Sequence, residues 1–169
     1  MSLMQEHEQF MAAALGEAIK AAREGEFPVG CVLVCNRQIV AQGHRKNSTN
    51  DTNEIDHAEI IALRELVSRQ EITDLSEVIL YSTMEPCLMC FSTLILSGVR
   101  TIVYGYEDVM GGGTGLKLTE LPSLYADMKV TIIPHVLRDE CVKMFKVFFS
   151  DNDNGYWKNS LLAQYTLQQ

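Results

Sequence analysis

Two short groups of potential metal ligands constrain this chain most, because the fold must bring them together at one point. The first is His57-Ala58-Glu59, and the second is Pro86-Cys87-Leu88-Met89-Cys90. One imidazole and two thiols are ligands that zinc prefers, and three such ligands leave the fourth tetrahedral position open to water. A carboxylate beside that water can carry protons. The motifs therefore predict a catalytic zinc site, with His57, Cys87 and Cys90 as ligands and Glu59 as the proton carrier.

Other interpretations of the Cys-x-x-Cys pair are weaker. A redox pair is more often found in a thioredoxin-like setting, and a structural zinc site uses four protein ligands. The remaining cysteines, Cys31, Cys35 and Cys141, stand alone in the sequence. An offset of four residues on a strand spans roughly 13 Å, so Cys31 and Cys35 are too far apart for a disulfide. A non-catalytic, zinc-stabilised interaction module stays as an alternative, although the presence of Glu59 favours an enzyme.

The composition indicates one globular domain. A chain of 169 residues can bury a sizeable core, and no apolar run approaches the roughly 18 residues of a membrane span. Five cysteines, an odd number of which two are assigned to metal, are typical of a reducing compartment. We expect a single domain over residues 1–169, with a core at about 4–150 and a tail at 151–169, a cytoplasmic localisation and no membrane partner.

The charge balance disfavours a nucleic-acid partner. The chain has 14 Lys and Arg against 22 Asp and Glu, which gives a formal net charge of −8. Proteins that grip a polyanion normally carry a basic patch, because neutralising phosphates supplies much of the affinity. Arg45-Lys46 is the only adjacent basic pair in the chain. We therefore expect a small-molecule substrate, and we regard tRNA as the less favoured partner.

Hydrophobic periodicity predicts alternating helices and strands. The predicted helices are 4–23, 57–69, 87–96 and 138–149, and the predicted strands are 29–35, 38–42, 78–82, 101–104 and 129–133. The first two strands form a hairpin at Asn36-Arg37. The β-α-β-α-β order from residue 38 to 104 predicts neighbouring parallel strands. Helices then begin at the carboxyl edge of the sheet, where ligands bind, so both motifs can converge there.

Three stretches of the chain resemble the cytidine deaminase superfamily. They are Phe27 to Val34, His57-Ala58-Glu59, and Thr83 to Cys90. The last two match the H-x-E and P-C-x-x-C signature of zinc deaminases that act on nucleobases, and the tRNA adenosine deaminase-like branch is the most similar one. Over about residues 4–150, the resemblance implies an α/β fold: a three-layer α/β/α sandwich with a mixed five-stranded sheet. It also implies one Zn²⁺ per chain, hydrolytic release of ammonia and a homodimer.

The substrate contacts are less constrained by the motifs. Val29 and Glu85 lie within the matching stretches, and Glu85 resembles the adenosine-acting branch. That family usually has a base-contacting asparagine two residues after the glycine that ends the second strand, where this chain has Arg45. We assign the contact to Asn47, with Asn50 as a second candidate, and a turn role is an equal alternative for either.

Trp157 is a candidate lid over the pocket. It follows Gly155-Tyr156 in the tail, and cytosine deaminases also bring a C-terminal aromatic residue over the substrate; packing at a helix end is the alternative. We predict a hydrolase that deaminates an amino-substituted nucleobase, supplied as a free base or small nucleoside. Wobble adenosine deamination in tRNA is the alternative on the same catalytic apparatus.

Overall fold

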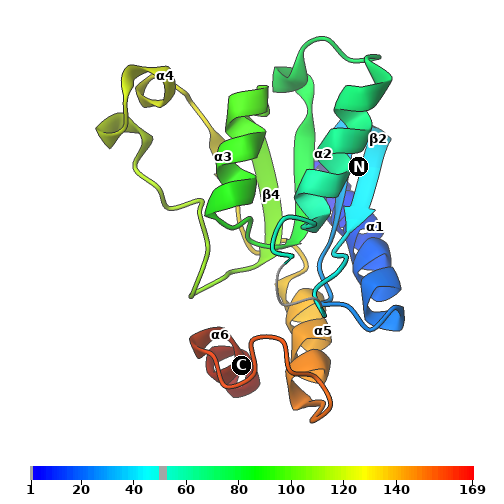
Figure 1. Ribbon diagram of the computed structural model, residues 1–169. Coiled ribbons are helices and arrows are strands. Elements are labelled where there is room, and N and C mark those ends of the chain that lie inside the picture. Colours follow the sequence, from blue (N-terminus) through cyan, green and yellow to red (C-terminus); the bar gives the residue numbers. More distant parts are fainter. Residues whose placement is uncertain (1, 50–52) are drawn as a thin grey trace.

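The structure, a computed structural model that describes residues 2–49 and 53–169, places a sheet between two layers of helices (Figure 1). The helices are α1 (Leu3–Arg23), α2 (Ala58–Arg69), α3 (Leu88–Ser97), α4 (Ser123–Ala126), α5 (Arg138–Ser150) and α6 (Leu161–Gln168). The strands are β1 (Gly30–Cys35), β2 (Gln38–His44), β3 (Ile79–Met84), β4 (Thr101–Tyr106) and β5 (Thr131–Ile133). No helix among the described residues has the length and apolar character to cross a membrane.

The sheet is mixed and five-stranded, as the resemblance implied, in the order β2-β1-β3-β4-β5. The predicted hairpin is confirmed, because β1 pairs antiparallel with β2 and the turn residues Asn36 and Arg37 have φ angles of 50° and 62°. These left-handed conformations suit a tight two-residue turn. β3, β4 and β5 are parallel.

One expectation about the sheet was wrong. β2 and β3 are not neighbours, because β1 lies between them and pairs antiparallel with both. Every residue of β1 is buried, whereas in β2 only Ala41 and Gly43 are buried, on either side of the exposed Gln42. A continuous apolar run belongs in the interior of a sheet and an alternating one belongs at its edge. The burial of β1 therefore decides the order.

Close approaches at two glycines show that α1 and α2 cover opposite faces of the sheet. A Cβ on Gly30 would lie 2.4 Å from the carbonyl oxygen of Ala14 in α1, and one on Gly43 would lie 2.4 Å from that of Ala58 in α2. Gly43 pairs with Cys31, the residue after Gly30. Since successive residues of a strand face opposite sides, the two glycines do so as well. Each lets its helix pack directly on the backbone.

The same alternation assigns α5 to the face of α1. A Cβ on Gly105 would lie 2.3 Å from the Cys141 sulfur in α5. Gly105 shares its face with Val103, which pairs with Tyr81, and the Tyr81 hydroxyl lies 2.8 Å from Nδ1 of His7 in α1. Figure 1 shows α2 and α3 together on the near side of the sheet. The predicted three-layer α/β/α sandwich is thus confirmed.

The tail holds a helix that the sequence pattern did not predict. α6 packs against α5, and its Leu162 is buried in the hydrophobic core. The hydroxyls of Thr166 and Tyr106 lie 3.0 Å apart, which connects α6 to the end of β4. An eight-residue helix offers barely two turns of periodicity, so its amphipathic pattern is weak in the sequence.

Candidate active site

The two motifs lie at the beginnings of α2 and α3. His57 and Cys87 are the N-cap residues of these helices, both have extended backbones, and neither side chain caps its helix. Cys90 follows in the first turn of α3. An N-cap side chain that makes no bond to its own helix is free to bind something else. The two helix starts therefore supply all three predicted zinc ligands.

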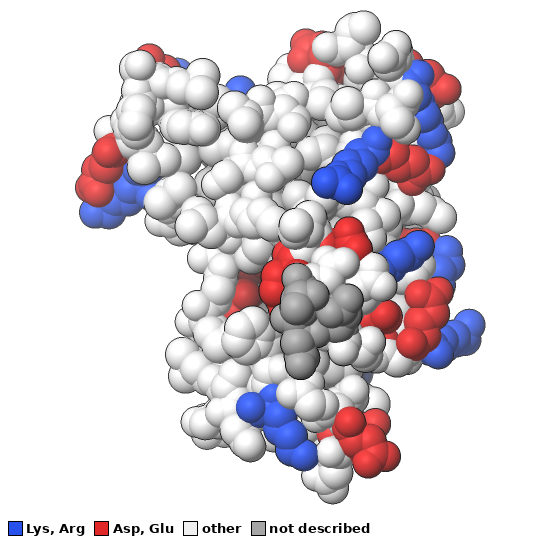
Figure 2. Space-filling view, in the orientation of Figure 1, with Lys and Arg blue, Asp and Glu red and all other residues white. Residues whose placement is uncertain are grey.

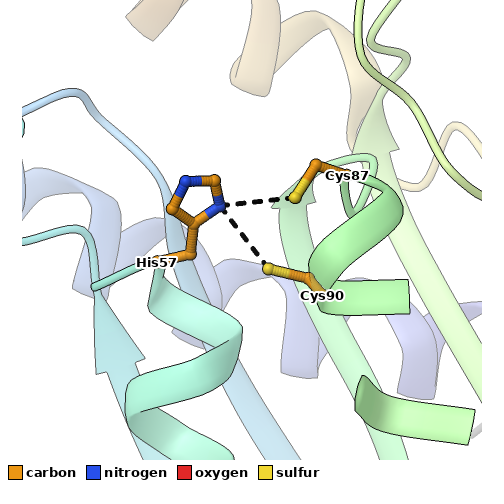
Figure 3. A group of neighbouring side chains, drawn as sticks. All are labelled: His57, Cys87 and Cys90. Carbon is orange, nitrogen blue, oxygen red and sulfur yellow. Dashed lines mark hydrogen bonds between the residues drawn. The ribbon is translucent and has the colours of Figure 1, made fainter. Parts of the chain in front are cut away.

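The three ligand atoms have the separation that a tetrahedral zinc ion requires. Nδ1 of His57 lies 3.5 Å from the sulfur of Cys87 and 3.5 Å from that of Cys90 (Figure 3). Zn–S bonds of about 2.3 Å and Zn–N bonds of about 2.0 Å at a tetrahedral angle would separate nitrogen from sulfur by about 3.5 Å. His57, Cys87 and Cys90 thus fit zinc, and they form a possible metal site among the described residues.

The electrostatics of the site favour a thiolate at Cys87. A hydrogen bond from Cys90 and, against the effect of burial, another from His57 lower the pKa of Cys87, while the hydrogen bond between the two cysteines and burial raise the pKa of Cys90. The position at a helix N-terminus acts in the same direction, because the helix dipole stabilises negative charge there. Zinc binds the thiolate form of cysteine, so this ligand is prepared for the metal.

Glu59 lies beside the ligands without being one of them. It is 3% exposed in the first turn of α2, and burial raises the pKa of its carboxyl group. The Ser82 hydroxyl donates to Oε1 at 3.3 Å, and the Cys90 sulfur lies 3.5 Å from Oε2. A buried carboxyl group with a raised pKa, next to a metal site, is suited to proton transfer.

His57, Glu59 and Cys87 line a cavity of about 280 Å³. The other lining residues are Phe27, Val29, Arg45, Glu54, Ala58, Met84, Glu85, Asp108, Met110, Gly111, Tyr156, Trp157 and Leu162. Of the four substrate contacts predicted from the sequence, Val29, Glu85 and Trp157 are therefore at the cavity. Asn47 instead donates to the Asp56 carboxylate at 2.7 Å. Asn50 lies outside the described residues.

The Glu85 carboxylate is engaged by the glycine-rich loop at 111–115. It accepts hydrogen bonds from the Asp108 amide at 3.1 Å, from the Thr114 amide at 3.3 Å and from the Thr114 hydroxyl. A Cβ on Gly112 would lie 2.4 Å from Oε2 of Glu85, and one on Gly113 would lie 2.7 Å from Cα of Leu88. Glycine at these positions lets the loop lie against the start of α3, where Glu85 anchors it.

The cavity residues that sequence reasoning missed include three that contact one another across two loops, Arg45, Glu54 and Tyr156. Arg45 is 2% exposed, and its guanidinium lies 5.7 Å from the centre of the Tyr156 ring. Glu54 accepts a hydrogen bond from the Tyr156 hydroxyl at 2.9 Å. The only sequence signal for these residues is their nearness to predicted site residues: Glu54 precedes His57 by three residues, and Tyr156 adjoins Trp157. Neither loop has a periodic pattern that would predict which side chains face inward.

Comparisons with known proteins identify relatives over most of the chain. The family described as "Cytidine and deoxycytidylate deaminase zinc-binding region" matches residues 4–106. The tRNA-specific adenosine deaminase of Bacillus subtilis (strain 168) is 34% identical over 148 residues, which cover 88% of this chain and 91% of that protein. The tRNA-specific adenosine deaminase 2 of Danio rerio is 35% identical over 162 residues, covering 89% and 74%.

Solved structures agree with this assignment. A structure from a study of A-to-I editing by tRNA:A34 deaminases superposes with a TM-score of 0.69 at 27% identity, covering 80% of this chain and 98% of the other. NE0047 in complex with 2,6-diaminopurine gives a TM-score of 0.70 at 23% identity, covering 89% and 85%. The second likeness concerns the fold alone.

These relatives overturn two expectations. The prediction of a free base or small nucleoside as substrate was wrong, and so was the disfavouring of a nucleic-acid partner, because the matching relatives are tRNA-specific adenosine deaminases. Net charge misled because it sums over the whole surface, whereas base-modifying enzymes recognise one base in a pocket. Figure 2 shows Lys and Arg interspersed with Asp and Glu on one face. The net charge of the chain therefore does not give the charge at any one place on its surface.

Proposed function

The chain belongs to the cytidine and deoxycytidylate deaminase zinc-binding family, and we propose that it deaminates adenosine to inosine in tRNA. Its membership makes it a zinc-dependent hydrolytic deaminase. The observation that carries the choice of substrate is the nearly full-length match to the Bacillus subtilis enzyme. The reaction adds water across the amidine of the adenine ring and releases ammonia.

The cavity supports a substrate of one nucleobase. Its volume of about 280 Å³ lies just below the roughly 300–1,000 Å³ typical of small-molecule sites. Enzymes that modify a base in a nucleic acid extrude that base into such a pocket. Phe27, Val29 and Trp157 give the cavity apolar walls against which a planar base can pack.

The residues divide the chemistry between them. When zinc is bound by His57, Cys87 and Cys90, it lowers the pKa of a water molecule and so supplies the nucleophile at neutral pH. Glu59 would accept the proton that the attacking water loses and deliver it to the ring nitrogen. It would then take the proton of the hydroxyl group added to the ring and pass it to the amine, which leaves as ammonia while the carbonyl forms. Its raised pKa supports this role, because a proton carrier works best when its pKa is near the working pH.

A homodimer is the second part of the proposal. Leu88 and Leu96 on α3 and Leu124 on α4 are 55%, 57% and 61% exposed. The segment that contains α4 stands away from the sheet on the side of α3 (Figure 1). Large exposed apolar side chains are the residues from which interaction surfaces are built, and these three support an interface on this side of the molecule. Sedimentation of the wild type and of a Leu96→Glu variant tests the dimer, and a monomeric wild type contradicts it.

The substrate is tested with an anticodon stem-loop that carries adenosine at the wobble position. We expect the purified zinc protein to form inosine and ammonia in equal amounts. A stem-loop with guanosine at that position is the matched control and is expected to stay unchanged. Ammonia release from free bases or nucleosides, without inosine formation in any tRNA, would overturn the proposal.

A further inference from the structure

One oxygen of Glu54 contacts two residues near it in the sequence and a third residue in the C-terminal tail. Oε2 lies 3.4 Å from Nε2 of His57, accepts a hydrogen bond from the Tyr156 hydroxyl at 2.9 Å and lies 3.3 Å from a guanidinium nitrogen of Arg45. The first residue is a zinc ligand, the second belongs to the C-terminal tail, and the third lies just after β2. Glu54 itself is in the loop before α2.

The contact with His57 has a direct chemical consequence. Nδ1 of His57 faces the two cysteine sulfurs and is the atom that would bind zinc, so in the zinc-bound site Nε2 would be the ring nitrogen that carries the proton. A carboxylate that accepts this proton in a hydrogen bond fixes the tautomer and the orientation of the ring, and it makes the other nitrogen a better ligand. Glu54 is placed to do both.

The contact with Tyr156 connects the same oxygen to the tail. The Tyr156 ring packs 5.1 Å from that of Phe27, and Trp157 lies beside it with ring centres 5.6 Å apart. Both tail aromatics line the cavity. Docking of the tail therefore places a hydroxyl on the carboxylate that orients the metal ligand.

Arg45 keeps this carboxylate in place. Its guanidinium donates to the backbone carbonyls of Lys46, Asn53 and Asp56, and this set of bonds fixes it beneath Glu54. It also lies over the Tyr156 ring, 5.7 Å from the ring centre. A buried cation held by neutral carbonyls stabilises a neighbouring negative charge. Glu54 is thus held from one side by Arg45 and from the other by Tyr156.

We propose that Glu54 is the positioning residue of the zinc ligand His57, and that it couples zinc binding to the docking of the tail at Tyr156. Because coupling between two sites is reciprocal, removal of zinc loosens the tail, and removal of the Tyr156 hydroxyl weakens zinc binding. The inference concerns the metal centre of the deaminase, and it does not depend on which molecule is deaminated.

The first test measures zinc affinity by competition with a chromogenic chelator. Loss of an outer partner of a metal-ligating histidine typically costs about 10- to 100-fold in affinity, and we expect this for Glu54→Ala. Glu54→Gln keeps the side-chain shape and an oxygen that can accept from Tyr156, so it is the variant less prone to misfold. We expect its zinc affinity to fall by less than that of Glu54→Ala. The zinc affinity of Tyr156→Phe is expected to fall a few-fold. Glu65→Ala is the matched control, because it removes from α2 a carboxylate that pairs with Arg69.

The second test uses Trp157, the single tryptophan of the chain. Its fluorescence reports the state of the tail without any need for substrate or activity. We expect chelation of zinc to shift the emission of the wild type to longer wavelength, as the tail loosens and the indole becomes more exposed. In Glu54→Gln and Tyr156→Phe this zinc-dependent shift is expected to shrink or disappear.

The two measurements decide the proposal together. Unchanged zinc affinity in both Glu54 variants would show that His57 is oriented by other groups and would overturn the positioning role. If the Trp157 emission of the wild type is the same with and without zinc, the proposed coupling is wrong. A double-mutant cycle between Glu54→Gln and Tyr156→Phe completes the test. If the two residues act through one network, the double variant loses less zinc-binding free energy than the sum of the two single variants.

Discussion

The cavity has two walls that are built in different ways. On the metal side, Cys90 is fully buried and Glu59 is 3% exposed, and both lie in the first turns of helices that pack on the sheet. On the tail side, Trp157 is 45% exposed and has a φ angle of 52°. The backbone of regular elements fixes the metal wall, whereas side-chain contacts such as the one from Tyr156 to Glu54 hold the tail wall.

Because of this difference, we expect the metal side to hold the reacting groups and the tail side to control how a substrate enters. A wall fixed by helices and strands holds reacting groups within the narrow tolerance that catalysis needs. A wall held by a few polar contacts can open locally at low free-energy cost, so that a substrate can enter. Substitutions on the metal side should therefore abolish turnover, whereas those on the tail side should change it by degrees.

The largest effect is expected for Cys87→Ser. A hydroxyl replaces thiolate poorly as a zinc ligand, so this variant should lose both zinc and measurable deamination. Metal analysis of the purified protein and an inosine assay check this. Cys35→Ser, a change at the end of β1 away from the ligands, should keep its zinc. Full activity of Cys87→Ser would mean that the metal wall is not where the chemistry occurs.

The next effect separates the ligands from the proton carrier. Glu59→Gln should keep stoichiometric zinc, because Glu59 does not ligate it, while turnover falls by about 10²- to 10⁴-fold, the usual contribution of a general acid–base group. Zinc content and kcat are measured on the same sample. If zinc is lost with the carboxylate, or if turnover is largely retained, the assigned division of roles is wrong.

The glycine loop should show an intermediate effect. In Gly112→Ala the added Cβ would lie 2.4 Å from the Glu85 carboxylate and 2.7 Å from the Asp108 carbonyl oxygen, so the loop must move away from α3. We expect kcat/KM to fall by about tenfold, because small displacements of positioning groups are costly. Gly115→Ala is the matched control, since nothing lies within 4 Å of its added Cβ.

A graded effect is expected for Trp157→Ala on the tail wall. If the indole stacks on the base, KM should rise about fivefold or more, because stacking of a base on an aromatic side chain contributes ~1–3 kcal/mol. Trp157→Phe should restore part of the loss. An unchanged KM would assign Trp157 to packing alone. A point substitution is preferable to deletion of the tail, which would also remove Leu162 from the core.

The smallest effect concerns the pH dependence of tail docking. Arg138 and Tyr165 donate to Glu107, and although burial acts in the opposite direction they lower its pKa from 4.5 to about 2. A lowered pKa adds stability above the unfolded pKa, and this stability is lost as the pH falls through the folded value. Glu107→Gln should therefore be about 1–2 kcal/mol less stable at pH 7, after solvent screening is allowed for.

Urea unfolding at a series of pH values checks this sign. The difference between wild type and Glu107→Gln should shrink between about pH 4.5 and pH 2. Glu120→Gln removes an exposed carboxylate that pairs with Lys117 on the surface, and it should change little at any pH. A difference that grows as the pH falls would contradict the assignment.

Much of the metal wall could be predicted from the sequence. The ligands His57, Cys87 and Cys90 follow from residue types and spacing, and the helix starts follow from the change in periodicity at each motif. Both are local properties of the chain, so no long-range information is required. The hairpin at Asn36-Arg37 is predictable for the same reason.

The substrate contacts could not be predicted in this way. The sequence predicted that Asn47 contacts the base, but its side-chain amide donates to Asp56 instead. Short polar side chains readily form hydrogen bonds within their own loop. Arg45 reads as a surface cation in the sequence, yet three backbone carbonyls accept from it in the interior. These outcomes depend on how the loop closes on itself.

The sequence by itself determined the α/β fold, the three residues of the candidate zinc site and the carboxylate beside them, because each depends on residue types at short, fixed spacings. The tertiary structure decided that β1 separates β2 from β3, that Glu85 binds a loop, and that Glu54 meets both His57 and Tyr156. Except for the contact between Glu54 and His57, which depends on how their loop is folded, these contacts join positions far apart in the chain. Burial and packing select them, and neither is encoded in the spacing of a motif.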